Sequence, residues 1–151
     1  MTLKIFLVGL PAMLLCLIVQ SAVTFWCVRY YVRQSVQPRS RWALLPGLRP
    51  LVVAMLVLMC GNLLQIGLWA LLFVSLGEFS ELYEAIHHSA VNFTSLGYGD
   101  FVMTKDWKLL GPLEAVNGVL MLGMTAAALM AILQHMIKVQ QDAILQSAEH
   151  R

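Results

Sequence analysis

Three long apolar segments, separated by polar stretches, set the pattern of the chain. They cover residues 5–28, 51–76 and 110–137. A helix of about 20 apolar residues can cross a bilayer, so each segment is predicted to form one membrane span. A fourth stretch, residues 81–93, has an apolar portion that is too short to span. It is predicted to be a short helix that enters the membrane and returns, buried in protein.

The composition agrees with a membrane protein of one domain. The chain has 151 residues, of which 60% are hydrophobic and 12% are charged. A soluble domain usually carries about twice that charged fraction. A net charge of +2 is too small to suggest a nucleic-acid partner. Cys16, Cys27 and Cys60 lie in apolar segments without paired spacing, so we expect no disulfide or metal framework.

The uneven distribution of charge predicts the topology. Residues 29–50 hold five arginines and no acidic residue, whereas residues 77–109 hold five acidic residues and two lysines. The positive-inside rule places residues 29–50 in the cytoplasm. The acidic segment then lies outside, together with the amino terminus, and the carboxyl terminus lies inside. The arginines are Arg29, Arg33, Arg39, Arg41 and Arg49.

Residues 29–50 are also predicted to form a loop. Pro38, Pro46 and Gly47 should interrupt any long helix there, and Pro50 suits the first turn of the second span. Within that span, Asn62 and Gln65 share a helix face and are expected to hydrogen-bond to neighbouring helices, because lipid offers no partner.

The first span has an alternative interpretation. A lysine followed by an apolar run also resembles a secretory signal peptide. The run is longer than a typical signal core, and residues 19–21 make a poor cleavage site. Trp26, Tyr30 and Tyr31 suit an interfacial anchor at the end of a retained helix. We therefore interpret the segment as a membrane span.

The short helix of residues 81–93 leads into an unusual polar segment. Ser80 is a candidate amino-terminal cap, with Glu81 and Glu84 favourably placed near the positive end of the helix. The carboxyl end would direct partial negative charge towards the membrane centre, where it would stabilise a dehydrated cation.

The polar segment that follows is Thr94-Ser95-Leu96-Gly97-Tyr98-Gly99-Asp100. Gly97 and Gly99 allow backbone conformations that most residues avoid. Such a backbone can direct successive carbonyl oxygens to one side, and Ser95 adds a hydroxyl oxygen. Four copies around an axis would form stacked oxygen rings that replace the hydration shell of a monovalent cation.

This segment closely resembles the selectivity filter of the potassium channel family, usually written T-T-V-G-Y-G-D. Residues 97–100 match it, Thr94 and Ser95 hold the two threonine places, and Leu96 stands where valine or isoleucine is usual. Leucine lacks the β-branch that stiffens valine, which puts the degree of selectivity in question. Small bacterial ion channels with three helices and one pore loop are the most similar.

The resemblance implies an all-α membrane protein built as a homotetramer around one pore. It divides the chain into a peripheral helix (1–28), a cytoplasmic basic loop (29–50), a pore domain (51–137) and a cytoplasmic tail (138–151). Within the pore domain it implies an outer helix at 51–76, a pore helix at 81–93, a filter at 94–100 and an inner helix at 110–137. The short loops are compatible with a bacterial inner membrane, which is the expected location.

The resemblance also implies roles for single residues. Main-chain oxygens of Ser95, Leu96, Gly97 and Tyr98 would coordinate K⁺, with Gly99 completing the filter and no other cofactor required. Filter support would come from Thr94, Asp100, His87, His88 and Glu114.

Two of these support roles have competing interpretations. His87 and His88 occupy the aromatic places of the pore helix, and His88 is expected to donate to Asp100. It is either a neutral support or a group that makes the filter proton-sensitive. Glu114, with Asn117 three residues later, is expected to support the filter from behind rather than line the ion path.

Gly118 falls at the hinge place of the inner helix in this family, and Gly123 follows five residues later. Gating by helix bending and close helix packing explain these glycines equally well.

The leading functional hypothesis is a passive potassium channel that catalyses no reaction. A non-conducting scaffold or regulatory subunit is the alternative. An intramembrane enzyme is disfavoured, because no serine–histidine–acid arrangement, paired catalytic aspartates or metal-ligand spacing occurs.

Overall fold

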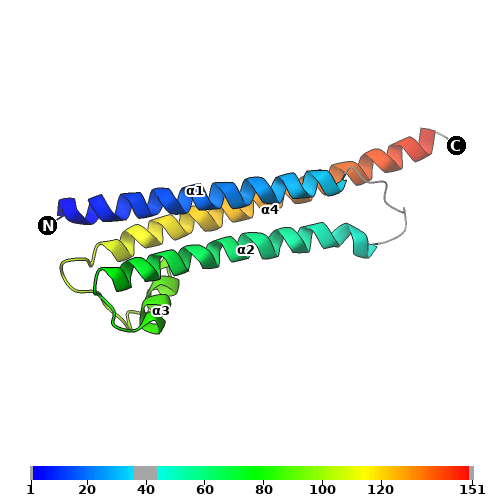
Figure 1. Ribbon diagram of the computed structural model, residues 1–151. Coiled ribbons are helices and arrows are strands. Elements are labelled where there is room, and N and C mark those ends of the chain that lie inside the picture. The colour runs from blue at the N-terminus through cyan, green and yellow to red at the C-terminus, as the bar shows by residue number, and fades with distance from the viewer. Residues whose placement is uncertain (1, 36–43, 150–151) are drawn as a thin grey trace.

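The computed structural model describes residues 2–35 and 44–149. They form four helices and, within these ranges, no strand: α1 (Thr2–Ser35), α2 (Leu44–Ser75), α3 (Leu82–Phe93) and α4 (Leu110–Glu149). The three long helices lie side by side, with α2 running opposite to α1 and α4 (Figure 1). The short α3 lies at the end of the bundle that also holds the amino terminus (Figure 1).

The three long helices contain the segments that can cross a membrane. By length and composition these are Leu3–Arg33, Arg49–Ser75 and Leu110–Asp142. Each includes most of an apolar segment read from the sequence. Large apolar side chains stay exposed on their outer faces, as expected where lipid replaces water; Leu7, Leu14 and Leu63 are each more than half exposed.

The helices are longer than the sequence predicted. α1 continues to Ser35 and α2 begins at Leu44, so both ends of the expected loop at residues 29–50 are helical. Pro46 lies in the first turn of α2, where a missing N–H costs nothing. Pro50 lies at the start of the span Arg49–Ser75, as predicted, but it is not in the first turn of the helix, because α2 begins at Leu44. Pro38, Arg39 and Arg41 lie outside the described residues.

α4 is also longer than the inner helix read from the sequence. It begins at residue 110, as expected, but continues without interruption to Glu149. Residues 138–149 therefore extend the same helix, which projects beyond the ends of its neighbours (Figure 1).

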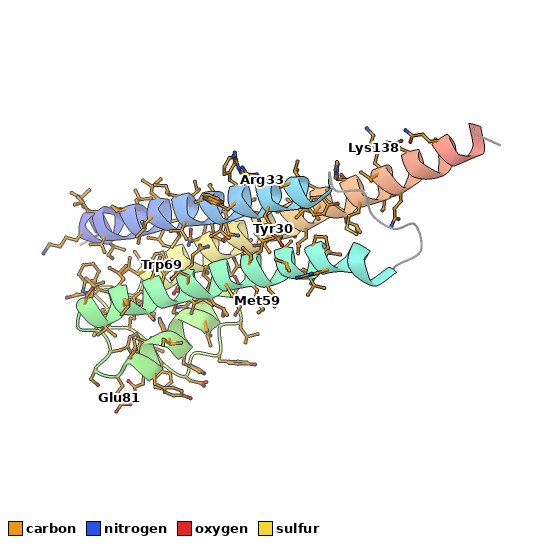
Figure 2. The ribbon with its side chains drawn as sticks, turned by 45° about the vertical axis from the view of Figure 1, so that its right-hand side comes forward. Tyr30, Arg33, Met59, Trp69, Glu81 and Lys138 are labelled. Carbon is orange, nitrogen blue, oxygen red and sulfur yellow. The ribbon has the colours of Figure 1, made fainter. Side chains whose placement is uncertain are left out.

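Two apolar clusters hold the bundle together. The cluster near α3 joins all the long helices and includes Ile5, Trp69, Phe73 and Leu110. The cluster at the opposite end packs Tyr31, Ala54, Leu58 and Ile132. Trp69 points from α2 into the bundle (Figure 2), and its ring centroid lies 5.8 Å from that of Phe73.

Between these clusters lies a polar core that joins α1, α2 and α4. Gln65 donates to the Gln20 side-chain oxygen at 2.7 Å, and Gln20 donates to the Thr125 hydroxyl at 2.9 Å. Asn62 also donates to Thr125, at 3.1 Å. The predicted interhelical bonds of Asn62 and Gln65 are therefore confirmed. Gln20 was not singled out from the sequence, yet it is fully buried.

Candidate functional site: the segment after α3

The start of α3 differs from the prediction. Its N-cap residue is Glu81, in an extended conformation and without a side-chain cap hydrogen bond. The assignment of Ser80 as the cap was therefore wrong. Glu84 does lie in the first turn, where its charge favours the positive end of the helix dipole.

The carboxyl end of α3 is bonded to the residues that follow it. Ser95 N–H donates to Asn92 O at 2.8 Å, and Leu96 N–H donates to Val91 O at 2.9 Å. The Thr94 hydroxyl donates to Ala90 O at 2.7 Å. These donors satisfy the last carbonyl groups of the helix. Less unpaired negative charge is then left at its carboxyl end to stabilise a cation than the sequence predicted.

The backbone of this segment alternates in handedness. Ser95, Gly97 and Gly99 have positive φ angles of 58°, 65° and 76°. Neither Leu96 nor Tyr98 has a positive φ. When the sign of φ changes at every second residue, successive carbonyl oxygens can face one side of the backbone. In an ordinary strand they point alternately to the two sides. The sequence predicted unusual backbone conformations at the two glycines but not at Ser95. A serine with a positive φ carries backbone strain.

The segment has no cover within one chain. Residues 94–100 are all exposed, with the Leu96 side chain at 55% and Tyr98 at 66% of their full exposure. One chain could thus provide at most a single row of oxygens. A row on one side cannot replace the hydration shell of a cation, which needs oxygens all around it.

His88 contacts the chain just after this segment, but not at Asp100 as predicted. Its Nδ1–H donates to the Phe101 carbonyl oxygen at 2.9 Å, one residue beyond Asp100. Its Nε2 accepts from the Asn92 side-chain amide at 2.8 Å. A carbonyl can only accept and an amide nitrogen only donate, so these two partners select the neutral imidazole tautomer. Burial, the largest influence, lowers the pKa of His88, which also favours the neutral form.

His87 has a different environment. Its ring packs edge-on against Phe101, with centroids 5.4 Å apart. Its Nδ1 is buried and has no hydrogen-bond partner among the described residues. The two histidines therefore both contact Phe101, but only His88 anchors its backbone.

Glu114 is fully buried on α4 and is bonded to α3. Ser89 Oγ lies 2.5 Å from Glu114 Oε1 and 2.8 Å from the carbonyl oxygen of Ile66 on α2. Asn117, which the sequence suggested as a partner, has a buried amide nitrogen with no partner in the described part of the chain. Ser89 and Asn92 were missed from the sequence, although Ala85, Ser89 and Asn92 follow the spacing of one helix face.

Gly118 and Gly123 have different surroundings. A β-carbon on Gly118 would meet the backbone of Phe93, the last residue of α3, at less than van der Waals distance. A β-carbon on Gly123 would meet nothing within 4 Å. Close packing therefore accounts for Gly118 but not for Gly123.

The loop after the segment is tied to the loop before α3. The Glu78 carboxylate accepts from the Thr104 backbone N–H and from the Thr104 hydroxyl, both at 2.6 Å. Together with the His88 bond to Phe101, this contact fixes the chain on the carboxyl side of residues 94–100.

A short helix, an exposed segment with alternating φ signs and a long helix packed against α3 follow one another along the chain. A family model described as an ion channel matches residues 52–135. The chain belongs to this ion channel family. The match begins in α2 and ends in α4, so it includes α3 and the segment of residues 94–100 but leaves α1 out. No curated protein and no solved structure matches the chain.

Family membership confirms the resemblance to potassium-channel-type pores that the filter motif indicated. It makes this ion channel a multi-pass membrane protein and points to transport of ions rather than to catalysis. Its helices α1, α2 and α4 contain segments that are long and apolar enough to be its spans.

Proposed function

We propose that this ion channel is a potassium-selective pore that conducts K⁺ passively. The observation that carries the proposal is the alternation of φ sign at Ser95, Gly97 and Gly99. It suits a row of main-chain oxygens from Ser95, Leu96, Gly97 and Tyr98, with Gly99 completing the turn. Carbonyl oxygens held at fixed spacing are the ligands of potassium filters.

The exposed filter supports assembly into a homotetramer. Four rows of oxygens around one axis would surround the ion, and no other cofactor is needed. The partners would then be three further copies of the chain, the lipid bilayer and K⁺. In this arrangement α3 would be a re-entrant pore helix, because it is 12 residues long and too short to span.

The charged residues support a topology with the filter outside. Arg33 and Lys138 lie towards one end of the bundle, and Glu81 lies at the other, beside α3 (Figure 2). The positive-inside rule then places the α3 end and the amino terminus outside, and the end of α4 in the cytoplasm. We propose a bacterial inner membrane as the location.

Thr94, Asp100, His87, His88 and Glu114 would support the filter rather than bind the ion. The contacts of Thr94, His88 and Glu114 run to the backbone or side chains of α3, α2 and the loop after the filter. Gly123 is the better candidate for a gating hinge, because Gly118 already has a packing role.

The test is ion flux through the purified full chain in liposomes, driven by a potassium or a sodium gradient. We expect potassium flux that barium blocks and that exceeds sodium flux. Gly97→Ala should reduce it by roughly tenfold or more, because alanine at positive φ costs about 1–2 kcal/mol in each chain.

Gly67→Ala is the matched control. Gly67 lies in α2 with open space around the position of a β-carbon and does not have a positive φ, so its flux should equal that of the wild type. Equal sodium and potassium flux would overturn selectivity and leave a channel. Absence of flux over a range of pH and voltage would instead favour the non-conducting scaffold.

A further inference from the structure

Ser89 lies between two oxygen atoms that compete for one proton. Its hydroxyl oxygen is 2.8 Å from the carbonyl oxygen of Ile66 and 2.5 Å from Glu114 Oε1. A serine hydroxyl has a single hydrogen to donate. A backbone carbonyl can only accept, so Ser89 must be the donor in the contact with Ile66. The short contact with Glu114 then requires a hydrogen that Glu114 supplies.

The ionised form of Glu114 does not fit its surroundings. The residue is fully buried, and its Oε2 has no hydrogen-bond partner in the described part of the chain. No lysine, arginine or histidine nitrogen among the described residues lies within 4.0 Å of its carboxyl oxygens. A buried carboxylate without a cation is strongly unfavourable in a membrane.

We propose that Glu114 is a neutral carboxylic acid that donates a hydrogen bond to Ser89. Ser89 in turn donates to Ile66, so that one continuous chain of hydrogen bonds joins α4, α3 and α2. The groups that face Glu114 are Ser89 and Asn92 of α3 and Cys16 of α1, and none of them carries a positive charge.

This hydrogen-bond chain makes Glu114 a positioning residue for the segment of residues 94–100. Ser89 is next to His88, which holds the Phe101 carbonyl after that segment. The two neighbours anchor α3 in two directions, Ser89 to α2 and α4, and His88 to the returning loop. The protonation state stands on the contacts alone, whereas the effect on conduction rests on the proposed function.

Infrared spectroscopy of the purified full chain tests the protonation state directly. At about pH 8, exposed carboxyl groups are ionised. We expect one carbonyl-stretch band of a protonated carboxyl, shifted in D₂O and absent in Glu114→Gln. Glu84→Gln, an acid-to-amide change on the first turn of α3, is the control and should keep the band. A correctly assembled wild type without this band would overturn the proposal.

Ser89→Ala identifies the acceptor. It removes the oxygen that receives the Glu114 proton, so the band should remain and move in frequency, while an unmoved band would overturn the pairing with Ser89. Ser89→Ala removes only one oxygen from the bundle and should assemble. The spectra of the wild type and Ser89→Ala can therefore be compared even if Glu114→Gln assembles poorly.

Flux measurements test the positioning role. Glu114→Gln keeps a donor to Ser89 and should retain potassium flux within about twofold of wild type, whereas Glu114→Leu should lower the ratio of potassium to sodium flux. An unchanged ratio in Glu114→Leu would overturn positioning. A wild type that shows the infrared band but conducts no ion would refute the proposed function and leave the protonation state established.

Discussion

A β-carbon built on Gly118 would overlap the carbonyl oxygen of Phe93. The inner face of α4 and the last residue of α3 therefore touch backbone to backbone, one residue before Thr94. No side chain separates the long helix from the point where α3 ends. Any movement of α4 at this level must displace the start of residues 94–100 or separate the two backbones.

We therefore predict opposite effects for the two glycines of α4. Gly118→Ala must move the backbone of Phe93 and should lower the free energy of unfolding by about 1–3 kcal/mol. Gly123→Ala meets no atom of the described residues within 4 Å and should raise stability slightly, by roughly 0.5–1 kcal/mol, through better helix propensity. Thermal unfolding in detergent measures both. Equal effects of the two changes would show that the Phe93 contact is not tight.

The polar core predicts that α1 is coupled to α4. Gln20→Leu keeps the volume of the side chain but removes the bond to Thr125 and the acceptor for Gln65. Because single hydrogen bonds inside membranes contribute about 0.6 kcal/mol on average, the loss should be roughly 1–2 kcal/mol. Gln134→Leu, the same change at an exposed position of α4, is the control.

A double variant checks the coupling itself. Gln20→Leu combined with Thr125→Val should cost less than the sum of the two single changes, because both remove the same bond. Strict additivity in thermal unfolding would mean that Gln20 and Thr125 do not interact.

The contact between Glu78 and Thr104 should protect the loop after residues 94–100. Lys105 and Lys108 follow Thr104 and are both exposed, so trypsin reports on opening of this loop. Glu78→Ala removes two hydrogen bonds to one carboxylate and should cost about 1–2 kcal/mol locally, with cleavage roughly fivefold faster or more. Glu81→Ala removes an exposed acid without such a bond and should leave the rate unchanged.

The sequence predicted the elements well because their signals are local. The length of the apolar segments located the spans, and residues 81–93 differ by one position from the observed α3. Gly97 and Gly99 indicated positive φ directly, since glycine adopts it without strain. The extension of α2 through Pro46 was missed. A proline interrupts a helix in its interior but not in its first turn, and the sequence did not show where α2 begins.

The supporting contacts of the site were harder to predict because they join distant residues. Ser89 resembles any small polar residue on a short helix, and its role depends on oxygens 23 and 25 positions away in the chain. Nothing about a serine side chain indicates a positive φ, so the conformation of Ser95 could not be predicted from its residue type. His88 does contact the chain just after residues 94–100, but which carbonyl it meets depends on the path of the loop rather than on spacing.

The environment of His88 leads to a prediction about acid. Burial, opposed in part by the bond to Phe101, lowers the pKa of His88 below its ordinary value of about 6.5. A group with a lowered pKa in the folded state stabilises the protein above its unfolded pKa, and this contribution is lost as the pH falls. Protonation at Nε2 would also remove the acceptor of the Asn92 amide, because Nε2–H and the amide N–H are both donors and would face each other.

We therefore expect the midpoint of thermal unfolding to fall between about pH 7.5 and pH 5, and to fall less in His88→Phe. The two groups with charges near His88 are His87 and Glu78, so His87→Phe and Glu78→Gln are the controls. If His88→Phe shows the same fall as the wild type, His88 is not the acid-sensitive group. If only His87→Phe removes the fall, the sensitivity belongs to the histidine that packs on Phe101 without anchoring it.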